Sequence, residues 1–280
     1  MSTETRYTGV PATRNGLGSH SVPQGLQFSG LYAREVLKTF RNPFVLIITL
    51  VQPFKWLAFF GSSLSNVPLS ELDELLHVQI QSYLQFLLPG TLATSMLTIG
   101  MFGSMSTIQD KRFGFMKRIL ITPTSKVTVY LTKALGSATR GLVQIPVMVA
   151  AALIFGVRLN GDPLMWTGWV VSLALLGFGF SCLFLAITAS STDWQTPGVI
   201  SNFITMPLMF ASGALFPTAN FPKWMQTIAN YNPVTYAALF GRDIVLSGTA
   251  HWAYLGYVAI FAGAMVAIGS LVASKYLRVE

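Results

Sequence analysis

The sequence predicts an all-α integral membrane protein with six membrane-spanning helices. Of its 280 residues, 52% are hydrophobic and only 10% are charged, whereas about 25% of the residues of an ordinary soluble domain are charged. Apolar runs long enough to cross a bilayer core, which takes about 20 residues, recur along the chain, and the mean hydropathy is +0.56. A soluble fold of this length would need far more polar surface, so lipid is the expected solvent.

The N-terminal segment differs from the rest of the chain. Residues 1–26 are polar and rich in Gly, Ser, Thr and Pro, so we expect a disordered cytoplasmic tail without a cleavable signal peptide. Residues 27–280 are expected to form one transmembrane domain. It would begin with an amphipathic helix, 27–42, that lies in the membrane interface. The charged residues of this interfacial helix are Arg34, Glu35, Lys38 and Arg41.

Six apolar runs predict the spans and their orientation. They cover residues 44–64, 83–106, 138–157, 164–190, 198–217 and 252–274. An even number of spans places both ends of the chain on one side of the membrane. That side holds most of the basic residues, including those of 111–133, whereas the other side holds only Arg158, Lys223 and Arg242. Because basic loops stay in the cytoplasm, both termini are predicted to be cytoplasmic; the membrane itself is expected to be a prokaryotic inner membrane.

The segment 216–236 precedes the last span on the outer side. It is too irregular to span a membrane and too rich in aromatic residues for a free loop. Such a composition is typical of a segment that dips into the interface, where Trp and Tyr prefer to lie. We therefore expect an extracellular-side re-entrant segment there.

Motifs for chemistry are missing from the sequence. It has no GxxxxGK[ST] phosphate loop, no HExxH, no CxxC and no GxSxG, and Cys182 is its single cysteine. We therefore expect no ATPase, metal or hydrolase site in this chain, and a membrane lipid enzyme would lack its acid and base. The net charge of +8 lies between apolar spans and predicts no nucleic-acid partner. The absence of carboxylates from the span centres argues against a secondary transporter, although backbone carbonyls can bind sodium.

The basic segment QDKRFGFMKRILITPTSK, residues 109–126, follows the second span on the cytoplasmic side. Its apolar residues recur at near-helical spacing, and Pro123 ends the predicted helix. Gly114 is expected to permit close approach of another backbone. On charge alone, the segment is a positive-inside loop that anchors to lipid headgroups.

Lys55 lies midway along the first predicted span, in QPFKWLAFFG. A charge at that depth indicates a function; the alternative is that Lys55 reaches the interface or a carbonyl freed by Pro53. Arg140, near the cytoplasmic end of the third span, is expected to extend to the interface. Residues of the first and fifth spans either line an apolar substrate path or face lipid. The path residues would be Lys55, Trp56, Phe59, Phe203, Met206 and Phe210.

Two stretches carry specific residue patterns. The first consists of Asp110, Arg112, Gly114, Phe115, Arg118 and Pro123. The second, within 212–248, includes the outer-side motif residues Gly213, Phe216, Pro217, Trp224, Asn232, Pro233 and Tyr236, followed by Arg242. Both resemble ABC-2 type transporter permeases, and most closely the daunorubicin-resistance-type branch of drug and lipid exporters. With the six-span layout, the resemblance covers nearly the whole chain after residue 26.

The resemblance implies a permease without ATPase activity of its own. ATP and Mg would bind to separate nucleotide-binding subunits, and two permease chains, identical or paralogous, would meet two such subunits in the membrane. The segment 109–120 would be the coupling helix that docks on the ATPase, and 27–42 would be the second contact. The coupling residues would be Asp110, Lys111, Arg112, Phe113, Gly114, Phe115, Met116, Lys117 and Arg118.

Two departures and the substrate complete this interpretation. Many relatives carry acidic residues at the positions of Phe113 and Lys117, so the docking surface here is more basic than usual. The branch implies a hydrophobic drug or lipid-like substrate that is moved out of the cell. A polysaccharide linked to a lipid carrier is the alternative, because related permeases move such molecules.

Overall fold

The computed structural model describes residues 24–41, 43–63, 83–114, 124–155, 157, 161–191, 193 and 195–276. Every regular element in these residues is helical. The α-helices are α1 (Gln24–Phe40), α2 (Pro43–Ser63), α4 (Tyr83–Arg112), α6 (Lys126–Leu142), α7 (Gln144–Ile154), α8 (Pro163–Ser190), α9 (Thr196–Phe210), α10 (Lys223–Tyr231), α11 (Pro233–Arg242) and α12 (Trp252–Tyr276). A 3-10 turn, η1 (Thr218–Asn220), and a π-helical turn, η2 (Asp243–Ser247), complete the described elements. The expected tail lies almost entirely outside the described residues.

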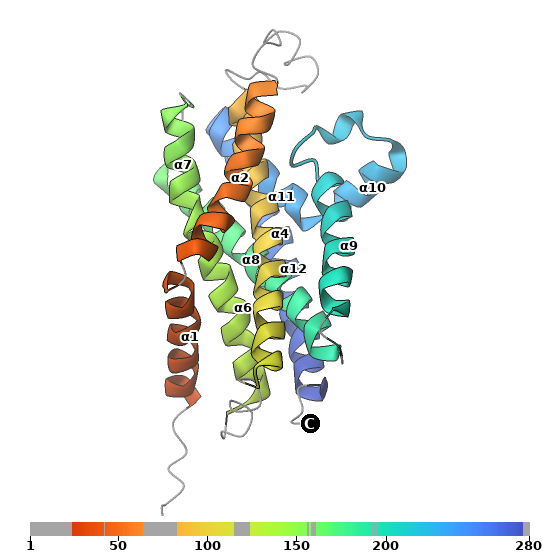
Figure 1. Cartoon of the computed structure of the whole chain (residues 1–280). Helices are drawn as coiled ribbons and strands as arrows, with labels where there is room; N and C mark the ends of the chain where they lie inside the picture. The colour runs from red at the N-terminus through yellow and green to blue at the C-terminus, as the bar shows by residue number, and fades with distance from the viewer. Residues whose placement is uncertain are drawn as a thin grey trace, which may run out of the picture.

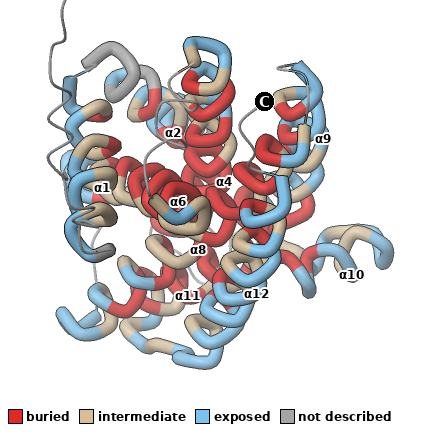
Figure 2. Tube along the Cα trace, turned by 90° about the horizontal axis from the view of Figure 1, so that it is seen from below, coloured by how far each residue is buried: buried red, intermediate tan, exposed pale blue. Residues whose placement is uncertain are grey.

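The centre of the bundle is formed by α4 and α8. Figure 2 shows buried residues concentrated in α4, α6 and α8, and exposed residues along the outer faces of α9, α10 and α12. Small residues let these helices approach closely, as is common in membrane bundles. A Cβ on Gly100 would lie 2.9 Å from Phe180 of α8, and one on Gly179 would lie 2.8 Å from the ring of Phe261 of α12. The helices therefore cross where side chains are absent.

Four helices of the described chain are long and apolar enough to cross a membrane: α4, the continuous stretch Lys126–Ile154 formed by α6 and α7, α8 and α12. The first expected span corresponds to α2, which has 21 residues. The fifth expected span, 198–217, is wrong at its end, because α9 has 15 residues and stops at Phe210. That length is below the roughly 20 residues that cross a bilayer core. The described structure therefore supports a helical membrane protein without establishing six spans.

The third span begins at Lys126, twelve residues before the expected start at 138. Its first half carries Lys133, Ser137 and Arg140, which lower the apolar character that a sequence pattern detects. All three side chains are buried in the bundle. A membrane helix whose polar residues face neighbouring helices needs no continuous apolar run. The hydropathy of the sequence therefore did not indicate the first half of this helix.

The two ends of the described chain lie at the same end of the bundle. Figure 1 shows the start of α1, the end of α4, the start of α6 and the end of α12 together at its lower end. It also shows α1 running alongside α6 and not across the end of the bundle, and these two helices contact each other extensively. The expected interfacial helix is therefore a packed helix, and it begins at Gln24, three residues earlier than expected.

The opposite end carries the segment between α9 and α12. Gly213 has a φ of +62°, a backbone conformation that favours glycine, and it turns the chain after α9. In Figure 1, α10 projects beside the top of α9, whereas α11 lies inside the bundle next to α4. The indole nitrogen of Trp169 in α8 donates a hydrogen bond to the Ala237 carbonyl of α11 over 3.1 Å. The short helix α11 is therefore held within the core.

Candidate coupling site

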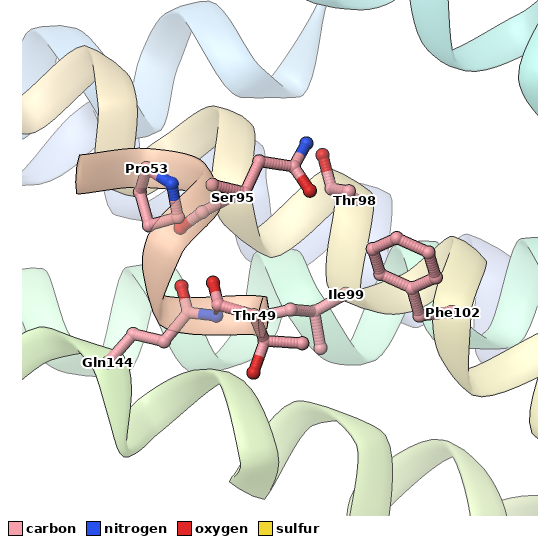
Figure 3. A pocket seen from close by; sticks show the side chains of 8 residues that line it. Thr49, Pro53, Ser95, Thr98, Ile99, Phe102 and Gln144 are labelled. Atoms are coloured by element: carbon pink, nitrogen blue, oxygen red, sulfur yellow. Dashed lines mark hydrogen bonds between the residues drawn. The ribbon is translucent and has the colours of Figure 1, made fainter. Parts of the chain in front are cut away.

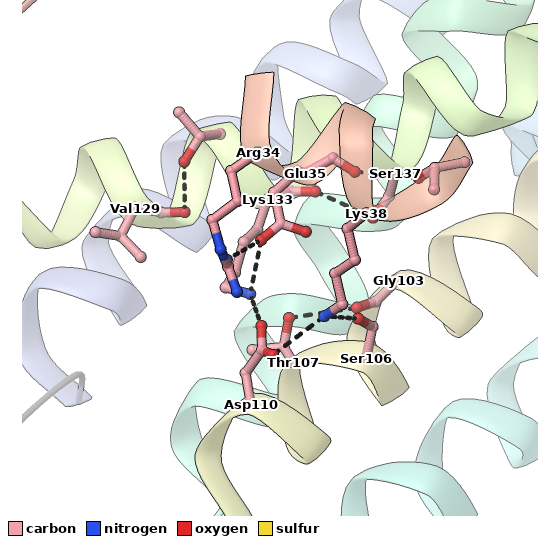
Figure 4. Close-up of polar contacts among 12 residues, drawn as sticks. Arg34, Glu35, Lys38, Gly103, Ser106, Thr107, Asp110, Val129, Lys133 and Ser137 are labelled. Carbon is pink, nitrogen blue, oxygen red and sulfur yellow. Dashed lines mark hydrogen bonds and ion pairs between the residues drawn. The ribbon is translucent and has the colours of Figure 1, made fainter. Parts of the chain in front are cut away.

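A cluster of charged side chains joins α1, α4 and α6 near the lower end of the bundle (Figure 4). Lys133 of α6 lies between two carboxylates: its ammonium pairs with Asp110 of α4 and, over 3.3 Å, with Glu35 of α1. Lys38 of α1 reaches the other oxygen of Asp110 over 3.1 Å. Glu35, Lys38, Asp110 and Lys133 are called the charged cluster below. Three helices far apart in sequence therefore share one network of ion pairs.

Further hydrogen bonds surround the charged cluster. Arg34 pairs with Glu35 over 3.0 Å, and Lys38 also donates to the Ser106 hydroxyl of α4 over 2.9 Å. Arg140 donates to the Thr39 hydroxyl over 3.1 Å. The hydroxyls of Tyr32 in α1 and Thr139 in α6 lie 2.8 Å apart. These contacts extend the α1–α6 interface over several turns of both helices.

Glycines bring the three backbones close enough for short ion pairs. A Cβ on Gly136 of α6 would lie 2.7 Å from the Cβ of Glu35. A Cβ on Gly103 of α4 would overlap the Ser137 side chain of α6. Neither overlap can be relieved by moving the far end of a long side chain. The glycines therefore set the distance at which α1 and α4 pack on α6.

Burial makes the charges of this cluster interdependent. The side chains of Lys133, Glu35 and Asp110 are 6%, 9% and 10% exposed, respectively. Isolated charges are costly at such sites, and removing one partner of a buried pair leaves an uncompensated charge. The gain in stability from the intact network is modest, but separating its members is expensive. The cluster is therefore suited to moving α1, α4 and α6 as one unit.

The basic segment emerges directly from the cluster. Asp110 belongs to the last turn of α4, which continues to Arg112, and the Gly114 amide donates to the Lys111 carbonyl over 3.1 Å. Gly114 has a φ of +68° and no heavy atom near its Cβ position. Of the expected helix 109–120, residues 109–112 are the end of α4, the chain turns at Gly114, and residues 115–120 lie outside the described residues. The glycine supplies a left-handed conformation at this turn, and its expected close approach to another backbone stays a prediction.

The predicted coupling residues fall into different environments. Asp110 is buried in the charged cluster, and the Lys111 ammonium donates to the Thr188 carbonyl of α8 over 2.7 Å. Arg112 is exposed, and Phe113 has 78% of its surface exposed. Phe115, Met116, Lys117 and Arg118 lie outside the described residues. Within the described part, Arg112 and Phe113 are thus the coupling residues placed on the surface.

Lys133 and Arg140 were missed as site residues by sequence reasoning. Arg140 is buried and bonded to Thr39, so the expectation that it extends to the interface is wrong. A signal was present: Lys126, Lys133 and Arg140 recur at intervals of seven residues and so share one helical face. Of the predicted interfacial residues, Glu35 and Lys38 join the charged cluster, Arg34 lies at its edge and Arg41 is exposed.

The predicted substrate-path residues lie mainly on the outside of the single chain. Lys55 is exposed, with its ammonium 5.7 Å from the ring centroid of Trp56, which is half-buried. Phe59 of α2 and Phe203 of α9 are exposed. Met206 and Phe210, also of α9, are exposed as well. The Thr49 carbonyl, four residues before Pro53, accepts a hydrogen bond from the Gln144 amide over 2.9 Å.

The outer-side motif has a clear structural basis in two of its residues. The Asn232 side chain accepts from the Val234 amide over 3.0 Å and donates to the Leu208 carbonyl of α9 over 2.7 Å. It thereby caps α11, whose first residue is Pro233, a favoured position for proline. Asn232 and Pro233 thus start α11 and tie it to α9. The remaining motif residues are the turn residues Gly213 and Pro217, the exposed Phe216 and Trp224, and Tyr236, whose ring stacks on Tyr257.

Arg242, at the end of α11, locks this region. Its guanidinium is buried and donates to the carbonyls of Gly213, Ala214 and Phe86 over 2.8, 2.6 and 3.1 Å. It also lies 3.6 Å from the ring centroid of Phe86. The sequence pattern included this arginine, but its three carbonyl partners come from segments that only folding brings together.

These features define a helical membrane protein with a cluster of buried ion pairs near one end of its helix bundle. The ABC-2 type transporter model matches residues 26–246, and the chain belongs to this family. Members of the family are the membrane subunits of ATP-binding-cassette transporters. The order of motifs that resembled these permeases in the sequence is thus confirmed as a family relationship.

Similar proteins span much of the chain. It is 29% identical over 261 residues to the putative transport permease ycf38 of Pyropia yezoensis. This match covers 91% of this chain and 84% of that protein. It is 27% identical over 188 residues to the daunorubicin resistance ABC transporter permease protein DrrB1 of Streptomyces coeruleorubidus, covering 67% of this chain and 66% of the relative. A further relative is nodulation protein J of Rhizobium leguminosarum bv. trifolii, 28% identical over 171 residues, with 59% of this chain and 63% of that protein covered.

Proposed function

We propose that this chain is the permease of an ATP-driven exporter for a hydrophobic drug or a lipid-like molecule. The single observation that carries the proposal is the charged cluster, which links α1 and α6 to the turn of α4 from which the basic segment emerges. The family and the drug-resistance relative support the substrate class. In this arrangement the exposed end of α4 is the contact surface for the partner, and the charged cluster links it to α1 and α6.

The partners in this proposal follow from the chemistry of the surface. A separate subunit binds ATP and Mg and docks on Arg112, Phe113 and the basic segment, with cations facing carboxylates and the phenyl ring filling a groove. A second permease chain, a copy or a paralogue, meets the exposed aromatic side chains of α2 and α9. The excess of basic residues at this end of the bundle supports the proposal that this end and both termini lie on the cytoplasmic side of a prokaryotic inner membrane.

In the proposed mechanism, motion of the ATPase reaches the spans through the charged cluster. A displacement of the basic segment moves Asp110. Because Lys133 pairs with both Asp110 and Glu35, Glu35 follows this displacement while both ion pairs stay intact. Because α2 follows α1 after a short connection, a shift of α1 moves α2 and its exposed aromatic residues. The result is a rigid-body rearrangement that opens a path between two permease chains.

The test is charge reversal at Arg112 and Arg118, in the complex with the partner ATPase. We expect R112E/R118E to lose at least about tenfold in ATPase co-purification and in substrate-stimulated hydrolysis, since each interfacial charge would then repel its partner. The matched control is Lys223→Glu, a reversal at the opposite end of the bundle, which should leave both measurements unchanged. Undiminished binding and stimulation in the double variant would refute docking at this segment.

A further inference from the structure

A small pocket opens between α2, α4 and α7 at the middle of the bundle's height. Pro53 is the central residue of α2, and Ser95 and Thr98 lie within three residues of the centre of α4. None of the residues that line the pocket is ionised. Figure 3 shows its labelled lining residues: Thr49 and Pro53 from α2, Ser95, Thr98, Ile99 and Phe102 from α4, and Gln144 from α7.

The backbone of α2 sets the orientation of the Gln144 amide. Pro53 has no N–H, so the carbonyl of Thr49, four residues earlier, lacks its helical donor. The Gln144 amide nitrogen donates to that carbonyl over 2.9 Å. The reverse orientation would set the Gln144 oxygen against a carbonyl that can only accept. The amide nitrogen is therefore committed to α2, and the oxygen is the group left for the pocket.

The Gln144 oxygen receives no hydrogen bond from any residue that the structure describes, although the residue is only 2% exposed. Buried polar atoms without a partner are rare and costly. The hydroxyls beside it do not supply the missing hydrogen. Ser95 donates to the Leu92 carbonyl over 2.7 Å, and Thr98 donates to the Thr94 carbonyl over 3.1 Å. The Gln144 oxygen is thus an acceptor for whatever enters the pocket, and the Gln52 amide, which also lines it, carries both donor and acceptor atoms.

This pattern selects the chemistry of an occupant. A carboxylate or phosphate brings no hydrogen for the Gln144 oxygen, and an ammonium would carry a charge into a site without a counter-charge. A hydroxyl supplies one donor, carries no charge and can also accept. The apolar remainder of an alcohol would contact Pro53, Ile99 and Phe102. A neutral hydrogen-bond donor on an apolar molecule is therefore the best match.

We propose that this pocket binds the hydroxyl group of an apolar alcohol or phenol, with Gln144 as the acceptor. Resting on the proposed export function, the site recognises the hydroxyl of the transported molecule at mid-membrane depth. Pro53 has a defined part: by freeing the Thr49 carbonyl, it holds the Gln144 amide in the orientation that leaves an acceptor available.

The binding test uses the purified full chain in lipid nanodiscs. The probe is an alkanol that carries a photoreactive diazirine, and the matched control probe is the same diazirine alkane without the hydroxyl. We expect saturable labelling of the α4 peptide that contains Ile99 and Phe102, by the alkanol only, and competition by octanol but not by octane. Loss of one hydrogen bond in Gln144→Met should weaken labelling by about tenfold.

Two further variants separate binding from folding. Ser95→Val fills the pocket from α4 without touching the bond between Gln144 and Thr49, and it should also abolish saturable labelling. Ser172→Ala removes a buried hydroxyl on α8 that, within the described residues, likewise has no partner, and it should label as the unchanged chain does. Equal labelling by alkanol and alkane, or labelling that survives Ser95→Val, overturns the proposal.

The complex with the ATPase distinguishes a transported alcohol from a resident lipid hydroxyl. Stimulation of ATP hydrolysis by the alkanol that falls about tenfold in Gln144→Met supports a substrate site. Labelling without stimulation, in a complex that other substrates stimulate, assigns the pocket to a membrane lipid and overturns the substrate role. A complex that no drug or lipid stimulates, but whose permease still labels, leaves the hydroxyl site standing and refutes export as the function.

Discussion

Lys133 is the residue whose removal tests the charged cluster most directly. Lys133→Met keeps the apolar stem but removes the ammonium that pairs with both Asp110 and Glu35. Removing one partner of a buried ion pair costs about 3–5 kcal/mol. Asp110 keeps Lys38 and Glu35 keeps Arg34, so we expect the low end of this range, about 3 kcal/mol.

The assay is unfolding of the purified chain in mixed detergent micelles with increasing sodium dodecyl sulfate, followed by tryptophan fluorescence. Lys133→Met should lower the midpoint clearly. Adding Asp110→Asn should restore part of the loss, because the second substitution removes an uncompensated carboxylate. Lys38→Met should cost about 1 kcal/mol or less, since Lys38 is partly exposed and screened. Lys55→Met is the matched control, the same substitution at an exposed lysine.

A defined result would refute this reasoning. If Lys133→Met unfolds at the same detergent fraction as Lys55→Met, the cluster does not hold the three helices together. The complex with the ATPase gives a second measurement: export per ATP hydrolysed should fall in Lys133→Met, because α1 no longer follows α4. Unchanged coupling with lowered stability would restrict the cluster to a structural role.

Three further predictions concern single positions. Arg242→Met should lower the free energy of unfolding by about 3 kcal/mol in the same assay, because it leaves the buried Gly213 and Ala214 carbonyls without this donor. Arg242→Lys should not restore the lost stability, since a single ammonium cannot reach all the partners of the guanidinium. Gly90→Ala should prevent correct folding, since its Cβ would overlap the Ala214 carbonyl, so the monodisperse peak should be lost in size-exclusion chromatography. Normal elution would contradict the close packing of Gly90 on Ala214. Gly114 has a φ of +68°, which valine rarely adopts and asparagine tolerates. Gly114→Val should therefore lower the stimulation of ATP hydrolysis by substrate, whereas Gly114→Asn should retain it. Equal activity of the two variants would show that the turn is not required.

The sequence was a good guide wherever local patterns carried the information. Apolar runs located α4, α8 and α12, and residue order in two stretches indicated the family. It failed at the start of the third span and at the end of the fifth. In both places the hydropathy of a residue did not report its surroundings: polar residues of α6 are buried against other helices, and the apolar chain after Phe210 turns at Gly213.

The candidate site shows the same division. Arg34, Glu35, Lys38 and Asp110 were recognisable as charges near the ends of helices. Lys133, the partner of Glu35 and Asp110, was counted among the residues of a basic loop. No sequence spacing relates Glu35 to a lysine 98 positions away. The pairing depends on how closely α1 and α6 approach, which Gly136 decides.

By itself, the sequence determined that this chain belongs in a membrane, where its longest apolar helices lie, and which family it joins, because composition, apolar length and motif order are properties of consecutive residues. Only the tertiary structure decided that α1 packs along α6, that Arg242 closes the outer turn, and that Gln144 turns its oxygen into a pocket. Each of these depends on a hydrogen bond or ion pair between distant segments. Such contacts follow from the distance between packed backbones, which no local pattern specifies.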